Sequence, residues 1–379
     1  MSIHLLQLVS FRNHDIREFT FIRGLTVIWG ENGSGKTAVL EAIHTLSFGK
    51  SFRTHKQREM IRGSDELLII RGDFLSNKHP DTVAIQVNRS SGQKLKLNGN
   101  ALSGRKELIG RNNVVILSPE EQSITKGAPA ERRKFFDKMF SMSSKNYVDT
   151  LQQYSRVLKQ RNAAILNVKE NGQQAENLQS WDEKLIETGY KLWKIRFSFM
   201  NSFKTNLKST VGRYDKEIQF EITYPDKIPS LDTYQTKIKN SQKKDIALGR
   251  TTFGPHRDNI ALTWNNRDLR NFGSQGEHKL SLVLLKLAEL VFVRKNTGTH
   301  PTLLLDDLFA KLDLERSKKI VTLLQGLETE SGEPVQTIVT TTDLLNVEKS
   351  GLLSGEKENN RSEERRVGKE CRSRWSPYH

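Results

Sequence analysis

Two groups of residues suited to phosphate chemistry lie near opposite ends of this 379-residue chain. The first, residues 30–37, fits the pattern G-x-x-x-x-G-K-[ST], whose glycines let backbone NH groups surround phosphate oxygens. In this pattern Lys36 reaches the terminal phosphates and the Thr37 hydroxyl holds Mg²⁺. The pattern predicts a nucleoside triphosphate site formed by Gly30, Asn32, Gly33, Ser34, Gly35, Lys36 and Thr37.

The segments on either side of this loop have the character that it requires. Residues 25–29 are a short apolar, β-branched run that predicts a buried strand, and residues 38–43 continue with the apolar spacing of a helix. Strand, glycine loop and helix is the arrangement of a phosphate-binding loop, and the helix start adds partial positive charge to the site. A chance glycine-rich turn is the alternative, which this context disfavours.

The second group follows residues 302–305, a largely apolar run that predicts a strand ending in two carboxylates. We expect Asp306 to hold Mg²⁺ directly or through water, because hard cations take oxygen ligands. We expect Asp307 to orient or deprotonate the attacking water. Asp307 and the phosphate-binding Lys36 are therefore the candidate catalytic residues. An acidic pair at a strand end is also a common helix cap, but the phosphate-binding loop favours the catalytic interpretation.

A third group, residues 274–277, opens a pattern of helical apolar spacing. Small residues at a helix start leave backbone NH groups that can bind phosphate, so Ser274, Gln275 and Gly276 are candidate nucleotide ligands. A plain helix cap, with Ser274 as the capping residue, has the same spacing. These residues alone leave both interpretations open.

The order of the three groups resembles the ATPase head of the ABC and SMC class. In that class the serine-glycine signature of one subunit closes over the γ-phosphate held by another subunit. The resemblance implies that Ser274 and Gly276 act in trans, in an ATP-dependent homodimer, and that Leu312 and Asp313 match the D-loop at the same interface. It implies an α/β fold: an ABC-type P-loop ATPase head with an inserted α-helical arm domain.

Further segments are similar to the bacterial RecF family of DNA replication and repair proteins, over residues 3 to about 345: residues 8–13, 50–54, 117–120, 127–133, 158–162 and 254–258. This resemblance implies a cytoplasmic ATPase of recombinational repair and replication-fork maintenance, weakly active and stimulated by DNA. It also implies binding to duplex DNA, gaps and single-strand junctions, and cooperation with RecR and RecO in loading RecA. None of these partners follows from composition.

Two positions depart from the pattern of the class. The signature ends in Glu277, where the family commonly has glutamine, so the polar contact to a partner's nucleotide is expected to differ in detail. The strand-like run at residues 335–343 has no histidine where ABC proteins place a γ-phosphate sensor. The hydroxyl of Thr340 or Thr341 is the available substitute.

The periodicity of the chain suggests how its domains are organised. Strand-like runs and turns before residue 120 give way to helical i, i+3, i+4 spacing from about residue 130 to 211. We assign an ATPase head to residues 1–130 and 245–350, a helical arm to residues 131–244, and a frayed end to residues 351–360. The arm is expected to contain two antiparallel helices joined through residues 169–174.

Residues 361–379 resemble the translation of a sequencing adapter, and we exclude them from fold and function as a non-native tail. A basic, DNA-binding tail is the alternative. The native C-terminus is then expected to be missing, since members of the family continue into a short terminal strand. The tail holds six of the 60 Lys and Arg residues, three of the 44 Asp and Glu residues and the only cysteine, so the net charge without it falls from +16 to +13.

The positive net charge favours nucleic acid as a partner, although many soluble ATPases also have cationic surfaces. Candidate phosphate contacts are Arg53, His55, Lys56, Arg58, Arg62, Arg105, Lys106, Arg132, Arg133 and Lys134. His256, beside arginine and aspartate, is expected to be a hydrogen-bonded structural residue rather than a catalytic base. No apolar run approaches the roughly 20 residues that span a bilayer, so we expect no membrane association.

Three other functions share these motifs. A transporter cassette has the same nucleotide groups, but the helical insert and the basic charge fit it poorly. A small-molecule P-loop kinase needs no signature serine. A DNA-binding scaffold with a silent nucleotide site is expected to bind DNA independently of ATP.

Overall fold

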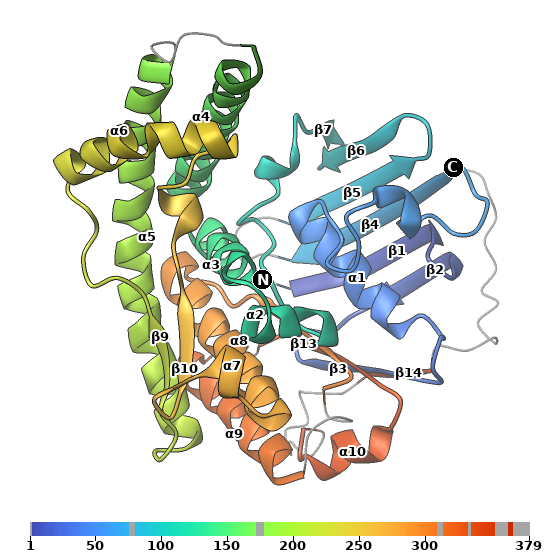
Figure 1. Ribbon diagram of the computed structural model, residues 1–379. Helices are drawn as coiled ribbons and strands as arrows, with labels where there is room; N and C mark the ends of the chain where they lie inside the picture. The colour runs from blue at the N-terminus through green and yellow to red at the C-terminus, as the bar shows by residue number, and fades with distance from the viewer. Residues whose placement is uncertain are drawn as a thin grey trace. The chain divides into compact units, whose positions relative to one another are not determined.

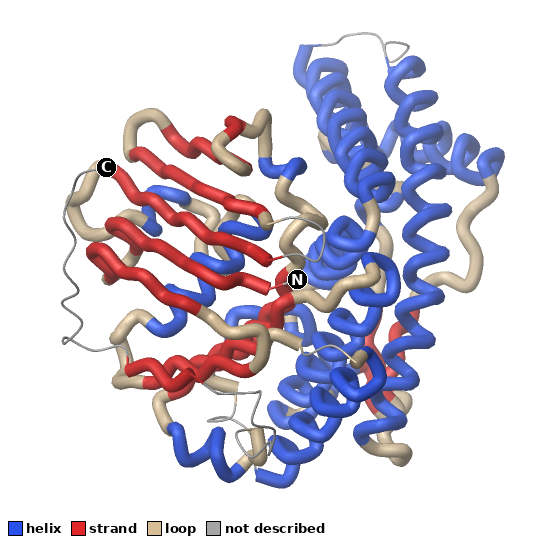
Figure 2. Tube along the Cα trace, turned by 180° about the vertical axis from the view of Figure 1, so that it is seen from behind, coloured by secondary structure: helices blue, strands red, loops and turns tan. Residues whose placement is uncertain are grey.

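The computed structural model describes residues 2–75, 80–171, 178–308, 314–332, 335–352 and 363–366 (Figures 1 and 2). The chain divides into two compact units. The first unit combines Met1–Glu120 with Thr299–His379, and the second unit is Glu121–Gly298. The two ends of the sequence therefore fold together in one unit.

An antiparallel sheet makes up one half of the first unit. Its strand order is β2-β1-β4-β5-β6-β7. The strands are β1 (Ser2–Phe11), β2 (His14–Thr20), β4 (Leu67–Leu75), β5 (Asp81–Asn88), β6 (Gly92–Leu97) and β7 (Asn100–Ala101). Buried positions alternate along β4 and β5, so this sheet buries mainly one of its faces.

The second sheet is parallel, and two of its strands lead into the predicted phosphate-binding motifs. Its order is β14-β3-β13-β12-β8, and all of its strand pairs are parallel. The strands are β3 (Leu25–Trp29), β8 (Val114–Leu117), β12 (Thr302–Asp306), β13 (Thr337–Thr341) and β14 (Glu363–Arg366). Every residue of β8, β12 and β13 is buried, as expected for parallel strands covered on both faces. This sheet confirms the predicted strands at residues 25–29 and 302–305.

The helix α1 (Lys36–Phe48) begins directly after the glycine loop and lies between the two sheets. It contacts β1, β4 and β5 of the antiparallel sheet and β8, β12 and β13 of the parallel sheet, and Figure 1 shows it lying along the antiparallel one. All its residues except Thr37 are buried, which explains why the apolar run at residues 38–43 shows little amphipathic character. The buried helix thus anchors the loop that precedes it to the core of the first unit.

Shorter elements complete the first unit. They are η1 (Gln57–Met60), η2 (Arg105–Glu107), α9 (Leu314–Ser331) and α10 (Leu344–Lys349), with η3 (Pro119–Gln122) at the point where the second unit begins. Leu312 and Asp313, the predicted D-loop, lie outside the described residues.

Four residues of the segment that we excluded from the fold form β14 at the edge of the parallel sheet. They pair with β3 in the register Glu363↔Thr26 to Arg366↔Trp29. Such pairing joins backbone groups, which any sequence can offer to an open strand edge. The pairing therefore leaves the adapter interpretation of residues 361–379 a prediction.

The second unit is mainly helical. Its elements are α2 (Ser123–Lys126), α3 (Pro129–Ser143), α4 (Lys145–Asn171), α5 (Gln179–Tyr214), β9 (Phe220–Thr223), α6 (Leu231–Leu248), η5 (Pro255–Arg257), β10 (Ala261–Trp264), β11 (Arg267–Asp268), α7 (Leu269–Phe272) and α8 (Gln275–Thr297). The strands form a small antiparallel sheet in the order β11-β10-β9. A membrane-crossing helix, judged by length and apolar character, is absent from the residues that the structure describes.

The helices α4 and α5 lie side by side and antiparallel, as predicted (Figure 1). Arg161 of α4 contacts Asp182 of α5, while Tyr147, earlier in α4, contacts Arg196, later in α5. The two helices therefore run in opposite directions. The predicted connection at residues 169–174 lies partly outside the described residues.

The boundary between the compact units differs from the one expected from sequence periodicity. We placed residues 245–298 with the ATPase head, but α8 packs against α3 and α5 within the second unit. Aromatic contacts explain this packing, because Phe292 of α8 meets Phe140 of α3 and Phe199 and Phe203 of α5. The assignment of a functional ATPase head and a separate arm stays a prediction.

A buried ion pair ties α5 to the segment that precedes β10. The Arg196 guanidinium, which is 2% exposed, donates to Asp258 at 2.6 Å and to Asp137 at 2.9 Å. Asp258 also accepts from Trp193 Nε1 at 2.8 Å and from the Tyr224 hydroxyl at 2.9 Å. One carboxylate therefore satisfies donors from several elements of the second unit.

The substitution Asp258→Asn is expected to destabilise the second unit, because it leaves the buried Arg196 charge without its closest partner. Breaking one side of a buried pair costs roughly 3–5 kcal/mol, so the free energy of unfolding in urea should fall by about that amount. Glu187→Gln, which breaks the exposed pair with Lys191, is the matched control and should leave the free energy of unfolding almost unchanged. Equal effects of the two substitutions would contradict this view of Asp258.

Candidate nucleotide-binding site

A cavity of about 640 Å³ opens in the first unit where β3, β12 and β13 end. Parallel strands end at a common edge, and this edge is the usual ligand site of such sheets. The residues that line the cavity are Arg12, Asn13, Asn32, Gly33, Gly35, Lys36, Thr37, Ala38, Arg53, Glu59, Ile61, Pro119, Glu120, Asp306, Asp307, Thr340 and Thr342. The structure thus brings most of the predicted loop together with the acidic pair.

The loop between β3 and α1 has a backbone that requires glycine at two positions. Gly33 has φ +80° and Gly35 has φ +98°, both in the left-handed region. A Cβ on Gly35 would also lie 2.5 Å from His14 Nε2 and 2.6 Å from the Asn13 side-chain oxygen. The glycines therefore allow both the turn and the close approach of the β1–β2 connection.

Asn13 and His14 brace the loop from that connection, and the sequence analysis assigned neither of them to the site. Asn13 Nδ2 donates to the Gly33 carbonyl at 3.0 Å, and His14 Nε2 lies 3.1 Å from the Gly35 carbonyl. Because a carbonyl only accepts, His14 Nε2 carries the hydrogen. Burial lowers the pKa of His14 although the contact with Gly35 opposes that shift. Asn13 belongs to a segment singled out by resemblance, which was the available signal.

Lys36 folds back over the loop. Its Nζ donates to the carbonyls of Gly30 and Glu31, both at 2.8 Å. Burial lowers the pKa of Lys36, and the nearby Asp307 and Asp306 carboxylates oppose this shift. The ammonium group is thereby held at the cavity, where it can attract an anion.

Thr37 and Asp306 are in direct contact. Thr37 Oγ1 donates to Asp306 Oδ1 at 2.8 Å, and Thr340 Oγ1 of β13 donates to the same oxygen at 2.7 Å. The parallel register, which places Asp306 opposite Thr340, accounts for this meeting. Thr341, the other candidate phosphate sensor, instead donates to the Asp343 carbonyl at 3.0 Å.

Asp307, the candidate catalytic carboxylate, lines the cavity in an uncommon backbone conformation. Its φ is +51°, which is rare for residues other than glycine. Its backbone NH donates to the Thr340 carbonyl at 3.0 Å, which holds this conformation against β13. Rare backbone conformations held in this way cluster at functional sites.

The residues present fit a triphosphate with a divalent cation. The hydroxyl oxygen of Ser34 is shielded from solvent and lacks a hydrogen-bond partner among the described residues, so it is available to a phosphate oxygen. Asn32 lies exposed on the cavity wall. The Thr37 hydroxyl and the Asp306 carboxylate are oxygen ligands of the kind that Mg²⁺ prefers.

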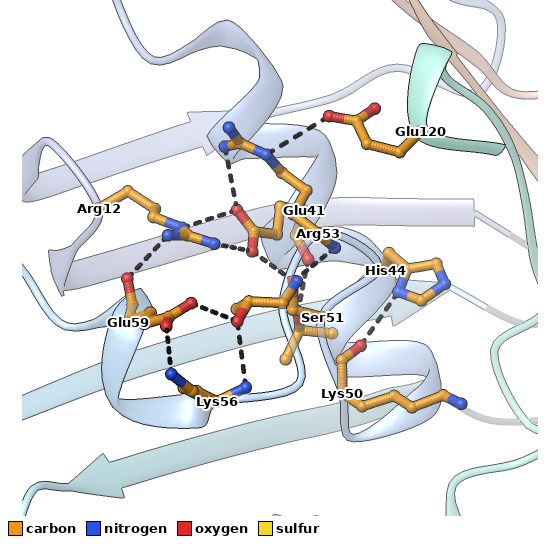
Figure 3. A network of polar contacts seen from close by, with 11 residues as sticks. Arg12, Glu41, His44, Lys50, Ser51, Arg53, Lys56, Glu59 and Glu120 are labelled. Atoms are coloured by element: carbon orange, nitrogen blue, oxygen red, sulfur yellow. Dashed lines mark hydrogen bonds and ion pairs between the residues drawn. The ribbon is translucent and has the colours of Figure 1, made fainter. Parts of the chain in front are cut away.

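A set of charged residues beside the loop was also missed as part of the site. Glu41 of α1 lies between Arg12 and Arg53, both of which line the cavity (Figure 3). Arg53 is also one of the candidate DNA contacts. The sequence signal for Glu41 was a single acidic residue inside the apolar run at residues 38–43, which in a buried helix indicates a paired charge.

The signature residues lie in the second unit at the start of α8. Ser274 caps this helix: its hydroxyl accepts from the Glu277 NH at 3.2 Å, and its own NH donates to Glu277 Oε2 at 2.7 Å. This capping box gives Glu277 a local role, and its hydrogen bonds with Ser274 lower the pKa of Glu277. Gln275 and Gly276 occupy the first turn, whose NH groups have no intrahelical acceptor.

The structure corrects one candidate DNA contact. Arg132 is 4% exposed and donates to the carbonyls of Ile260 and Gly127, so it is a structural residue of the second unit. Its neighbour Arg133 donates to the Asp258 carbonyl at 2.7 Å. The exposed members of the set are His55, Lys56, Arg58, Arg105, Lys106 and Lys134, with Arg53 on the cavity wall.

His256 is a hydrogen-bonded residue, as expected. Its Nδ1 lies 2.6 Å from the Tyr154 hydroxyl, and its Nε2 lies 3.1 Å from the Thr251 carbonyl. Burial is the main cause that lowers the pKa of His256 to about 4. A neutral imidazole with both nitrogens engaged is a structural element rather than a base.

Comparisons with known proteins place this arrangement in a family. Residues 2–362 match the family described as RecF/RecN/SMC N terminal domain. The DNA replication and repair protein RecF of Clostridium novyi is 33% identical over 356 residues, which cover 92% of this chain and 94% of that protein.

Solved structures agree with the sequence relatives. The structure of the recombination mediator protein RecF with ATP in the RecFOR pathway has a TM-score of 0.82 and 30% identity, and covers 90% of this chain and 92% of that one. An SMC head bound to the C-terminal winged-helix domain of ScpA, at 15% identity and a TM-score of 0.52, covers 92% of each chain and shares the fold. The fold is therefore that of an ABC-type ATPase head with an inserted helical part, and the chain belongs to the RecF family of DNA replication and repair proteins.

Proposed function

We propose that this chain is a DNA-binding ATPase that dimerises when it binds ATP and separates when it hydrolyses it. The observation that carries the proposal is the 2.8 Å contact between Thr37 of the phosphate loop and Asp306 at the end of β12. It joins the two halves of a triphosphate site beside Lys36, in the same cavity as Asp307.

The phosphate loop and Asp306 have proposed roles in binding. The loop NH groups between Asn32 and Thr37 surround the phosphates, and Lys36 exchanges its contacts with Gly30 and Glu31 for phosphate oxygens. Thr37 and Asp306 hold the divalent cation in place of their mutual hydrogen bond. Mg²⁺, when bound, neutralises phosphate charge and orients the terminal phosphate.

Asp307 is the proposed group that orients or deprotonates water for hydrolysis. Its carboxylate follows the metal-binding Asp306 directly, and its backbone is fixed by Thr340. Thr340 holds Asp306 through its hydroxyl, so the proposed phosphate-sensing role passes to Thr342, which lines the same cavity. These assignments propose what one copy of the chain contributes to a slow ATPase site without a sensor histidine.

The proposed second half of the site comes from another copy of the chain. Ser274 and Gly276 stand at the exposed start of α8, where backbone NH groups and the helix dipole favour an anion. A capping hydroxyl can exchange its local contact with the Glu277 NH for a phosphate oxygen. ATP then becomes part of the interface between two copies, and hydrolysis weakens that interface.

The proposed partners follow from the family. RecF relatives are described as DNA replication and repair proteins and as members of the RecFOR pathway. We propose that ATP-bound dimers of this chain bind duplex DNA at gaps or single-strand junctions in the cytoplasm, assist RecR and RecO in loading RecA, and leave after DNA-stimulated hydrolysis. The net charge, which is +13 without residues 361–379, suits a polyanionic partner.

Lys36→Arg is expected to abolish ATP-driven dimerisation or hydrolysis, or both, while the protein remains folded. Arginine keeps the charge but cannot reproduce the compact ammonium contacts at Gly30 and Glu31. Sedimentation with and without ATP, together with phosphate release, measures both properties. An ATP-driven dimer and wild-type turnover in this variant would refute the proposed site.

Asp307→Asn is expected to slow hydrolysis by roughly 10²- to 10⁴-fold, the usual size of a general acid–base contribution. Dimerisation on ATP should persist, because the amide keeps the shape of the side chain and Asp306 still holds the metal. Asp306→Asn should instead weaken the binding of ATP with Mg²⁺. Wild-type phosphate release by the Asp307 variant would remove this residue from the mechanism.

Mixing two inactive variants tests whether the site is shared between copies. Lys36→Ala removes the loop lysine, and Ser274→Arg blocks the start of α8. A mixed dimer has one intact loop facing one intact Ser274, so ATPase activity should reappear on mixing, up to about half of the wild-type level per dimer. A mixture that stays as inactive as its components would argue against a composite site.

A further inference from the structure

A buried carboxylate organises the wall of the nucleotide cavity. Glu41 lies on α1, and its side chain is 0% exposed. Arg12 donates to it through Nε at 2.9 Å and Nη2 at 2.6 Å. The Ser51 hydroxyl donates at 2.5 Å and Arg53 Nη1 at 3.4 Å. Figure 3 shows the two guanidinium groups approaching Glu41 from different directions.

The two arginines reach the cavity, whereas Glu41 does not. Arg12 and Arg53 are among the lining residues, with side chains that are 21% and 37% exposed. Arg12 Nη1 also donates to the Glu59 carbonyl at 2.7 Å, and Arg53 Nε lies 3.8 Å from Glu120. A guanidinium has five N–H donors, so these contacts leave donors on each arginine for a further acceptor in the cavity.

Holding two guanidinium groups together on the cavity wall requires a negative charge beside them. Arginine side chains have many rotamers, and two guanidinium groups close together repel each other. A buried carboxylate that accepts from both offsets the repulsion and fixes the planes of the groups, because charge-assisted hydrogen bonds are short and directional. The Ser51 hydroxyl is a neutral donor to the same carboxylate. Its oxygen also accepts from the backbone NH of Arg53 at 2.9 Å.

We infer that Glu41 is a positioning residue, which holds Arg12 and Arg53 on the cavity wall so that their remaining N–H donors meet the phosphates of the bound nucleotide. The inference rests on the proposed function, since it requires a phosphate-bearing ligand in this cavity. Glu41 touches no ligand itself and acts only through the two arginines.

The direction in which ATP affinity changes when Glu41 is neutralised distinguishes positioning from simple electrostatics. Neutralising a carboxylate near the site removes repulsion of an anionic nucleotide, so electrostatics alone predicts tighter binding. Positioning predicts weaker binding, because the arginines lose the group that orients them. A purely structural role predicts a loss of stability, and weakens binding of adenosine as much as binding of ATP if the cavity is distorted.

The test measures equilibrium affinity of the full chain for ATP with Mg²⁺ and for adenosine, at a temperature where circular dichroism shows each variant folded. Glu41→Gln is expected to bind ATP about tenfold more weakly, the size of one lost charge-assisted contact, with unchanged adenosine affinity. Glu41→Asp keeps the charge but shortens the reach, so it should also weaken ATP binding. This second variant serves if Glu41→Gln does not fold.

Glu59→Gln is the matched control for charge. Glu59 lines the same cavity, but its carboxylate contacts Thr54 and Lys56, and it accepts from Arg12 through its backbone oxygen. Its loss of charge should leave ATP affinity at or slightly above that of the wild type. The comparison of Glu41, behind the cavity wall, with Glu59, which lines the cavity, isolates the effect of holding the arginines.

A double-mutant cycle tests whether Glu41 acts through the arginines. In a chain carrying Arg12→Ala and Arg53→Ala, the further change Glu41→Gln should no longer weaken ATP binding. If the wild type binds ATP and Glu41→Gln binds it as tightly or more tightly, the inference fails while the proposed function stands. If the wild type binds no ATP, the proposed function itself fails. An equal loss of ATP and adenosine affinity would assign Glu41 a structural role only.

Discussion

The hydrogen bond between Thr37 and Asp306 is the interaction on which the site depends, because it joins residues 269 positions apart in the sequence. Neither residue would meet the other without the parallel sheet. β13 separates β3 from β12, and its Thr340 supplies a second donor to the same Asp306 oxygen. The register of the sheet therefore brings two distant sequence patterns together in one candidate site for a triphosphate and a divalent cation.

The surrounding packing holds the phosphate loop in shape. Below the loop, α1 is buried between two sheets, so the helix start cannot move independently of the core. Beside it, Asn13 and His14 hold loop carbonyls, and Glu41 holds the arginines of the cavity wall. In the second unit, the Arg196–Asp258 pair and the aromatic contacts of Phe292 fix the surroundings of α8, which Ser274 caps.

Sequence reasoning succeeded where structure is encoded in local patterns. The phosphate loop, β3, α1, β12 and the start of α8 were predictable because glycine spacing, apolar runs and a capping serine act over a few residues. The antiparallel α4 and α5 followed from helical periodicity. The interpretation of Ser274 as a cap is confirmed by the capping box, while its role in trans stays a prediction.

What was missed depends on contacts between distant segments. His14 and Glu41 gain their roles only when β1, β2 and α1 pack together, and no spacing rule connects them. Arg132 looked like part of a basic surface cluster, yet its guanidinium is buried against backbone carbonyls of Ile260 and Gly127. The compact unit that ends at residue 298 is held by aromatic side chains of three helices, whereas periodicity describes only one helix at a time. The assignment of a functional head and a separate arm stays a prediction.

The central claim is that the loop of one copy and the start of α8 of another enclose the same nucleotide. Cysteine cross-linking tests it most directly, because Cys371 is the only cysteine in the chain and can be replaced by serine. New cysteines at Asn32, on the loop, and at Phe272, which is 72% exposed just before Ser274, provide the pair. The account predicts a disulfide between two chains that forms with ATP and Mg²⁺ and not with ADP. A cross-link that is absent with ATP, or equally strong without nucleotide, would contradict it.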